Sequence, residues 1–141
     1  MITTINFVET VQMLKKGTRL YSIFKMKCPR CHEGDFFQAH PYNLKKAGDI
    51  YTHCSSCNVK YSKEPGFYYG AMYVSYALGV AVFVALWVMF NLFFEEVSVG
   101  IQLFTIIGIS ILLTPYLYAL SKIIWANLFI RYDESFRKDK A

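Results

Sequence analysis

The four cysteines of the chain stand in two Cys-x-x-Cys pairs, and this spacing predicts a metal site. Cys28 and Cys31 form the first pair, and Cys54 and Cys57 form the second. Two thiolates three residues apart bind one ion from a tight turn, and two such pairs place four sulfurs at about 2.3 Å from the metal in a closed tetrahedron. Because a closed site keeps no position for water, we expect a structural Zn²⁺. Iron is the alternative, since a rubredoxin-like site uses the same four ligands.

Other chemistries of the paired cysteines are weaker hypotheses. His32 follows the first pair, which therefore matches the C-x-x-C-H signature of c-type haem attachment, whereas Asn58 follows the second pair. Haem attachment needs the outer face of a membrane, and the charge pattern described below opposes that location. A redox dithiol is not favoured, because neither pair lies in a βαβ pattern. His53 could replace the thiolate of the neighbouring Cys54, although a histidine beside a zinc-binding turn is more often on the surface.

Two long uncharged stretches follow the cysteines. Of the 141 residues, 55% are hydrophobic and 18% are charged, and no charged residue occurs in 65–94 or in 97–121. As helices, these runs are about 45 Å and 37 Å long, which exceeds the roughly 30 Å of a hydrocarbon core. We therefore predict a membrane α-helical protein, with two transmembrane helices in a hairpin and a small N-terminal zinc-ribbon-like head. Two buried helices of a soluble protein are the alternative, but too few other residues remain to cover them.

The basic residues indicate the orientation of the hairpin. All 15 Lys and Arg lie outside residues 65–121, and the only charges in the turn between the two spans are Glu95 and Glu96. The positive-inside rule then places both termini in the cytoplasm and the turn between the spans outside. We expect no signal peptide, and a reducing cytoplasm favours metal binding over disulfides. The net charge of +5 is spread along the chain, so anionic lipid and not nucleic acid is the expected partner.

The pattern along the chain divides it into four parts. They are an amphipathic N-terminal segment at 1–24, a zinc-ribbon-like head with all four cysteines at 25–64, a two-span hairpin at 65–132 and a charged tail at 133–141. The head is too small to fold on an apolar core alone, so we expect the metal to stabilise it.

Finer features are predicted within these parts. The N-terminal segment reads as a helix ending near Gly17, which either lies on the lipid surface or packs on the head. Short strands are expected at 35–37 and 50–52. Pro65 is expected in the first turn of the first span, and Pro115 is expected to kink the second span.

Small and aromatic residues pattern the predicted spans. The small residues of the first span are Gly66, Gly70, Ala71, Ser75 and Gly79. Because helices approach closely at such residues in lipid, we expect this stripe to pack on the second span through Gly108, Ala119 or Thr105. Contact with another protein is the alternative.

The aromatic residues near the inner end of the first span, which are Tyr68, Tyr69, Tyr73 and Tyr76, are interpreted as an interfacial belt, with a quinone or haem pocket as the alternative.

Several of these motifs together resemble a known family. The Cys-Pro-Arg-Cys pair at 28–31, the second pair at 54–57 and the run Glu-Pro-Gly-Phe-Tyr-Tyr-Gly-Ala-Met-Tyr that starts at Glu64 are similar to an uncharacterised bacterial membrane family, domain of unknown function 983. The resemblance extends over residues 14–132. Members usually carry Gly directly after the first pair, where this chain has His32. The resemblance implies a two-span architecture with a cysteine-containing head, and it implies no activity.

The absence of catalytic motifs shapes the expected function. The chain contains no His-Glu-x-x-His, no phosphate-binding loop and no recognisable nucleophile–base pair, and the interiors of the spans carry no charge for a proton relay. We therefore expect a protein that is not an enzyme but a docking or accessory subunit of a larger membrane complex. The main alternative is a metal- or haem-handling assembly factor for a respiratory oxidase. An electron carrier and an enzyme acting on lipid have less support.

Overall fold

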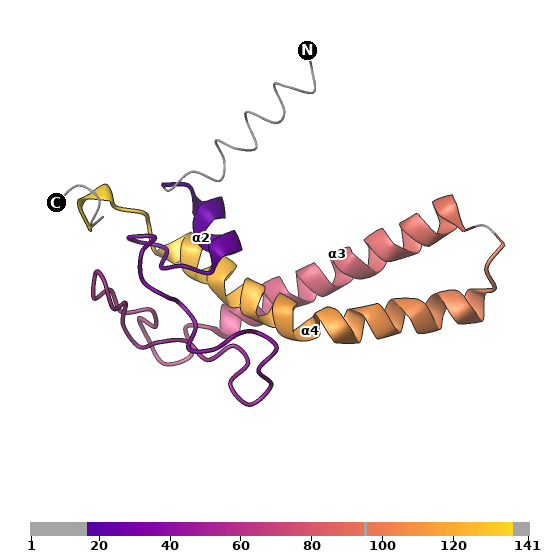
Figure 1. The fold of residues 1–141 in the computed structure, drawn as a ribbon, viewed down its shortest axis with the longest axis horizontal. Helices are drawn as coiled ribbons and strands as arrows, with labels where there is room; N and C mark the ends of the chain where they lie inside the picture. The colour runs from indigo at the N-terminus through magenta and orange to yellow at the C-terminus, as the bar shows by residue number, and fades with distance from the viewer. Residues whose placement is uncertain (1–16, 95, 137–141) are drawn as a thin grey trace, which may run out of the picture.

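Two long helices form a hairpin in the computed structural model of the chain, which describes residues 17–94 and 96–136. Helix α3 spans Tyr69–Phe93 and helix α4 spans Val99–Phe129, and Figure 1 shows them joined by a short turn at the end farthest from the cysteines. The short helix α2, Arg19–Lys25, and the 3-10 helix η1, Glu134–Phe136, lie at the opposite end. The predicted hairpin behind a four-cysteine region is confirmed.

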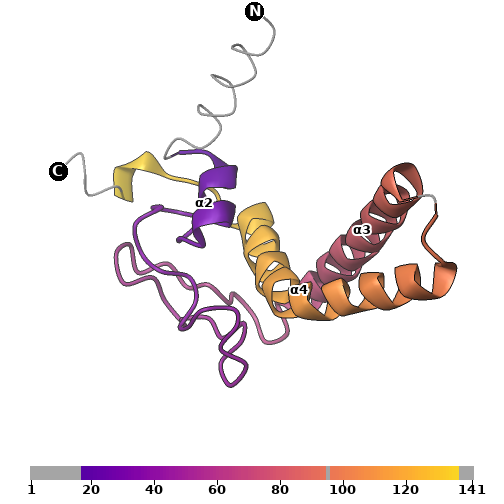
Figure 2. The ribbon, with the colours of Figure 1, turned by 45° about the vertical axis from the view of Figure 1, so that its right-hand side comes forward.

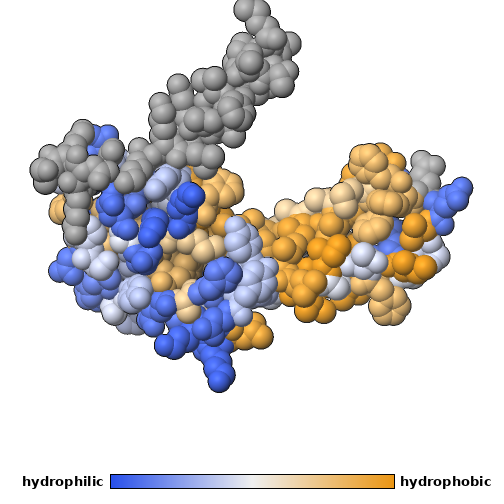
Figure 3. Space-filling view, in the orientation of Figure 1, coloured by the Kyte–Doolittle hydropathy of each residue, from blue (hydrophilic) through white to orange (hydrophobic). Residues whose placement is uncertain are grey.

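The surface of the hairpin is apolar and uncovered. In the most hydrophobic 18-residue stretch of α3, 0% of the residues are buried, and in that of α4 11% are buried. Both helices are long and apolar enough to cross a membrane. Figure 3 shows hydrophobic residues over the hairpin and hydrophilic residues over most of the head. Core helices of a soluble protein are mostly buried, so these exposures oppose that alternative.

The ends of α3 and the course of α4 follow from local backbone chemistry. The first span begins at Tyr69, so the prediction that Pro65 lies in its first turn is wrong. Gly66 adopts a φ of +81°, which is not helical, and the carbonyl of Gly66 accepts a bond from the Tyr69 N–H at 2.9 Å. Pro115 lies inside α4 and removes one helical N–H donor, and Figure 2 shows α4 changing direction between its orange and yellow ends.

The head contains turns and isolated bridges in place of strands. Within the described residues, the bridges pair Lys27 with Asp35, Phe37 with Ile50, and His53 with Lys60. The predicted strands at 35–37 and 50–52 are thus present only as single bridged positions. The predicted helix before Gly17 lies outside the described residues, and α2, which begins after Gly17, was not predicted.

The core of the head is built on the last turns of α4. Ala119, Ile123, Ala126 and Ile130 are at most 5% exposed, and their spacing of four, three and four residues places them on one helix face. Ile123, Ala126 and Ile130 pack in one buried cluster with residues of the head. The head contributes three of the cysteines and the rings of Phe36 and Tyr61 to this cluster. The core of the head therefore includes residues of the segment predicted as hairpin.

A polar contact fastens α2 to the same helix. The Asn127 side chain donates to Ser22 Oγ at 3.1 Å, and Ser22 Oγ donates to the carbonyl of Lys27 at 2.7 Å. Both side chains are buried, at 3% and 0% exposure. Because each buried polar atom in this chain of bonds has a partner, the contact fixes the position of α2 without leaving an unpaired group.

The small-residue stripe of α3 packs on α4 only at the end near the head. A side chain at Gly70 would overlap the indole of Trp125, whose Nε1 donates to the carbonyl of Phe67 at 2.8 Å. In contrast, a Cβ at Gly79 or Gly108 would meet nothing within 4 Å. The predicted packing of the stripe on the second span therefore holds at Gly70 and fails at Gly79 and Gly108.

These two glycines of α3, Gly70 and Gly79, give a matched test of the junction. We expect Gly70→Ala to destabilise the protein by about 1–3 kcal/mol, because the new methyl forces the Trp125 ring out of its contact with α3. Gly79→Ala places the same methyl in open space on the same helix and should leave stability nearly unchanged or slightly raised. Thermal unfolding in one detergent measures both, and equal melting temperatures for the two variants would contradict the packing.

Candidate metal centre

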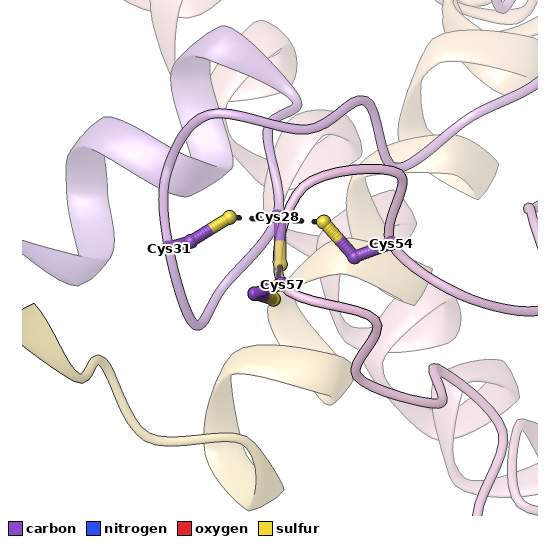
Figure 4. A group of neighbouring side chains, drawn as sticks. All are labelled: Cys28, Cys31, Cys54 and Cys57. Carbon is purple, nitrogen blue, oxygen red and sulfur yellow. Dashed lines mark hydrogen bonds between the residues drawn. The ribbon is translucent and has the colours of Figure 1, made fainter. Parts of the chain in front are cut away.

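The four cysteines predicted as ligands converge in the structure. Their Sγ atoms all lie within 4.8 Å of one another. The Sγ atoms of Cys28 and Cys57 are 3.8 Å apart, and those of Cys31 and Cys54 are 3.7 Å apart (Figure 4). A tetrahedron with metal–sulfur bonds of about 2.3 Å has edges of about 3.8 Å. The sulfurs are too far apart for disulfides, which require about 2.05 Å, and they surround a point where one ion fits.

The two cysteine pairs adopt similar backbone turns, of which the first is closed over one residue more than the second. In the first turn the Cys28 N–H donates to the carbonyl of Gly34 at 2.8 Å, and the N–H of His32 donates to the carbonyl of Cys28 at 3.0 Å. In the second turn Cys54 makes the equivalent bonds, to Val59 at 2.9 Å and from Asn58 at 3.0 Å. Each turn is closed by a single bridged pair behind the cysteines. Two like turns facing one another are the arrangement of a zinc ribbon.

Gly34 allows the two turns to meet. An ideal Cβ at this position would overlap Cys54 Sγ and lie 3.3 Å from Ser55 Oγ. Only a residue without a side chain leaves room for the second turn to approach the first at this distance. The steric role of Gly34 could not be read from the sequence, since the contact is with a residue twenty positions away.

Each turn requires left-handed backbone directly after its second cysteine. His32 has a φ of +59° and Asn58 has a φ of +55°. Asparagine tolerates this region well, whereas histidine normally adopts it at a cost. The His32 ring is 2% exposed, accepts the Gly17 N–H on Nδ1 at 3.1 Å, and packs 4.4 Å from the Tyr132 ring. These contacts help to hold His32 in its left-handed conformation.

The three histidines lie outside the sulfur cluster. His32 is held by the contacts just described, and it is not part of the group of atoms that could hold a metal ion. His53 and His40 are exposed, and His40 Nδ1 accepts the Tyr42 N–H at 3.4 Å. The structure therefore places neither His32 nor His53 as a fifth ligand or as a replacement for a thiolate.

Burial and hydrogen bonding divide the cysteines by their pKa values. Burial raises the pKa of the Cys28 thiol to about 11, and burial also raises the pKa of the Cys57 thiol. Burial acts on Cys54 in the same direction, but bonds from the backbone N–H groups of Cys57 and Ser56 oppose it, and the pKa of Cys54 is lowered to about 6. Without a cation, burial therefore favours the protonated thiols of Cys28 and Cys57, whereas hydrogen bonding favours the thiolate of Cys54.

Contacts from distant parts of the chain hold the site in place. Tyr61 is fully buried, packs on Phe36 with ring centroids 4.7 Å apart, and donates its hydroxyl to the carbonyl of Asp35 at 3.1 Å. The segment after α4 returns to the first turn, where the Asp133 N–H donates to the carbonyl of Arg30 at 3.0 Å. The sequence did not indicate that this segment contributes to the site, because it lies about a hundred residues from the first turn.

Comparison with known proteins identifies a family and no characterised relative. Residues 45–129 match the family described as a protein of unknown function, DUF983. The match includes the second cysteine pair and both long helices, and it begins after the first cysteine pair. No curated protein and no solved structure matches the chain.

A glycine substitution tests the sulfur geometry. We expect Gly34→Ala to weaken Zn²⁺ binding by at least about tenfold, because the methyl displaces Cys54 Sγ and opens the tetrahedron. Gly100→Ala is the control, since a Cβ there meets nothing within 4 Å. Competition with a chromophoric chelator measures the affinity, and an unchanged affinity in Gly34→Ala would show that the turns do not approach as described.

The pKa values predict that metal affinity depends steeply on pH. Cys28 and Cys57 hold their protons at pH 7 and must release them when a metal binds, so raising the pH removes the competition. The logarithm of the apparent Zn²⁺ affinity should therefore rise by at least about two for each pH unit near neutrality. The slope should steepen below about pH 6, where Cys54 also protonates. The same chelator competition at several pH values measures the slope, and a slope near zero would contradict the assignment.

Proposed function

The chain belongs to the DUF983 family of unknown function, and we propose that it is a zinc-containing accessory subunit that docks a membrane protein at the bacterial inner membrane. The observation that carries this proposal is that the cysteine cluster packs against the last turns of α4 in one buried core. One helix joins the apolar hairpin to the head, so the head has a fixed position relative to the membrane surface.

Zinc is the metal that the site suits best. The four donors are all thiols, three of them buried, and their spacing matches a tetrahedron of metal–sulfur bonds. A closed tetrahedral site supports structure and leaves no position for a substrate or for water, which favours a role other than catalysis. Iron would use the same ligands and would colour the purified protein.

The lengths of the helices support insertion in a bilayer. The 20 residues of α4 from Val99 to Tyr118 rise about 30 Å, which equals the thickness of a hydrocarbon core. The remaining turns of α4, up to Phe129, then project beyond the apolar region and enter the head. Because the basic residues that the structure describes lie on the side of the head, the positive-inside rule supports a cytoplasmic location for the head and both termini.

Open small residues on the hairpin support a protein partner. Gly79 of α3 and Gly100 and Gly108 of α4 have free space where a side chain would stand. In lipid, helices associate by close packing at such residues, since no hydrophobic driving force acts between them. A partner helix could therefore approach the hairpin along these positions, while the head presents a fixed polar surface.

The test is the size and composition of the complex in native membranes. Gentle detergent extraction should yield the chain in a larger assembly with one tightly held Zn²⁺ per chain. Gly79→Leu should reduce the co-purified partner without loss of zinc, whereas Val80→Leu, at an exposed apolar neighbour, should not. Native gels and mass spectrometry of co-purified proteins measure this outcome, and free monomer alone would overturn the proposal.

A metal-handling role is the second candidate, and one observation favours it. Cys57 is partly exposed, while Cys28, Cys31 and Cys54 are buried, so one ligand of the cluster is accessible from outside. An accessible thiol gives an incoming chelator or protein a point of attack on the metal. Challenge of the purified protein with a chelator separates the candidates, because a structural zinc is retained and a cargo metal is lost rapidly.

A further inference from the structure

A cavity lies where the head meets the hairpin. Its volume is about 320 Å³, and among the residues that line it are Ser62 of the head, Tyr69 and Met72 of α3, and Tyr118 and Lys122 of α4. Lys122 carries the only charge among the described residues that line this cavity. None of these residues belongs to the cysteine site, so the cavity is a second feature of the molecule that the metal does not explain.

Lys122 is a half-buried cation without a carboxylate partner among the described residues. Its Nζ donates to the carbonyl of Gly48 at 2.9 Å and lies 4.5 Å from the centroid of the Tyr118 ring. An ammonium group has three donors, and only one of them is used in these contacts. A charge removed from water is normally paired, so the two remaining donors favour an anion in the cavity.

The depth of the cavity identifies where this anion comes from. Lys122 follows Tyr118 by one helical turn, so it lies just beyond the 20 residues of α4 that match the thickness of a hydrocarbon core. Figure 3 shows the change from hydrophobic to hydrophilic surface at this end of the hairpin. In a membrane this is the level of the lipid phosphates. Met72, which lines the same cavity and is 62% exposed, continues the wall towards the apolar span.

The charge of the lining selects among lipids. No described residue that lines the cavity is acidic, so nothing there would pair with the ammonium group of a zwitterionic headgroup. The loop that contacts Lys122 through Gly48 also carries Lys45 and Lys46 beside a single acidic residue, Asp49, so its own charge is positive overall. Gly48 is suited to its place, because a Cβ there would lie 2.6 Å from the Tyr118 ring.

We propose that this cavity binds the phosphate of an anionic phospholipid through Lys122, so that one lipid is held between the head and the hairpin. The inference rests on the membrane insertion proposed above. A lipid bound there would contact α3, α4 and the residues that join the head to α3, and would add to the contacts that fix the head relative to the bilayer.

Lipid selection by the purified protein tests this site. The protein in detergent is mixed with equal amounts of phosphatidylglycerol and phosphatidylcholine of identical chains, and native mass spectrometry counts the lipids retained. We expect one phosphatidylglycerol per chain to be preferred. Lys122→Gln should lower that preference by about fivefold, which is the effect of one lysine near an anionic membrane surface, and Lys122→Arg should keep most of it.

Lys63→Gln is the matched control. Lys63 Nζ also donates to a backbone carbonyl, that of Phe129 at 3.4 Å, but Lys63 does not line this cavity. An equal loss in Lys63→Gln and Lys122→Gln, or no lipid preference in the unmodified protein, would overturn the site. If Lys122→Gln does not fold, the unmodified protein and Lys122→Arg still decide, because the site requires both to prefer the anionic lipid.

A further arm separates the lipid from free phosphate. Inorganic phosphate is added to the delipidated protein, and its effect on the melting temperature is compared with that of phosphatidylglycerol. We expect stabilisation by the lipid and none by phosphate; equal stabilisation would overturn the lipid assignment. The protein is also reconstituted in nanodiscs: failure to insert would overturn the membrane proposal itself, whereas insertion without lipid preference would overturn only the lipid site.

Discussion

The packing of the head on the last turns of α4 is the constraint on which the rest of the structure depends. A helix of 31 residues is about 46 Å long, so it extends well beyond a hydrocarbon core of about 30 Å. The extra turns carry a buried face made of Ile123 and Ala126, which Ile130 continues just after the helix. The short loops of the head cannot form an adequate core alone, so the core of the head includes this face of α4.

The sulfur cluster adds a second constraint, which is electrostatic. Four sulfurs within 4.8 Å of one another cannot all be thiolates without a cation, and the raised pKa values of Cys28 and Cys57 express the burial of both groups and that repulsion. A divalent metal reverses the balance by attracting all four charges. The packing on α4 and a metal bound by the cysteines would thus stabilise the head in different ways: the packing buries apolar surface, and the metal would join the two loops.

The elements of the fold were predictable where the signal is local. Uncharged runs of sufficient length identify the two helices, and the second run begins at residue 97, two residues before the start of α4 at Val99. The start of α3 was predicted four residues too early, because Pro65 is compatible with a first helical turn and the positive φ of Gly66 is not visible in the sequence. Helix α2 was missed, since seven residues make only about two helical turns and give little periodic signal, and the contact of Ser22 with Asn127 comes from a distant part of the chain.

The candidate site shows the same division between local and distant information. By itself, the sequence determined the number, type and spacing of the cysteines, and hence the turn that each pair forms. Three features are visible only in the folded chain. The two turns face one another across Gly34, the His32 ring lies outside the sulfur cluster, and Lys122 donates to the carbonyl of Gly48. The physical reason is that these contacts join residues between 15 and 74 positions apart. Such contacts depend on how the loops settle on α4, whereas the turns depend on hydrogen bonds within a few residues.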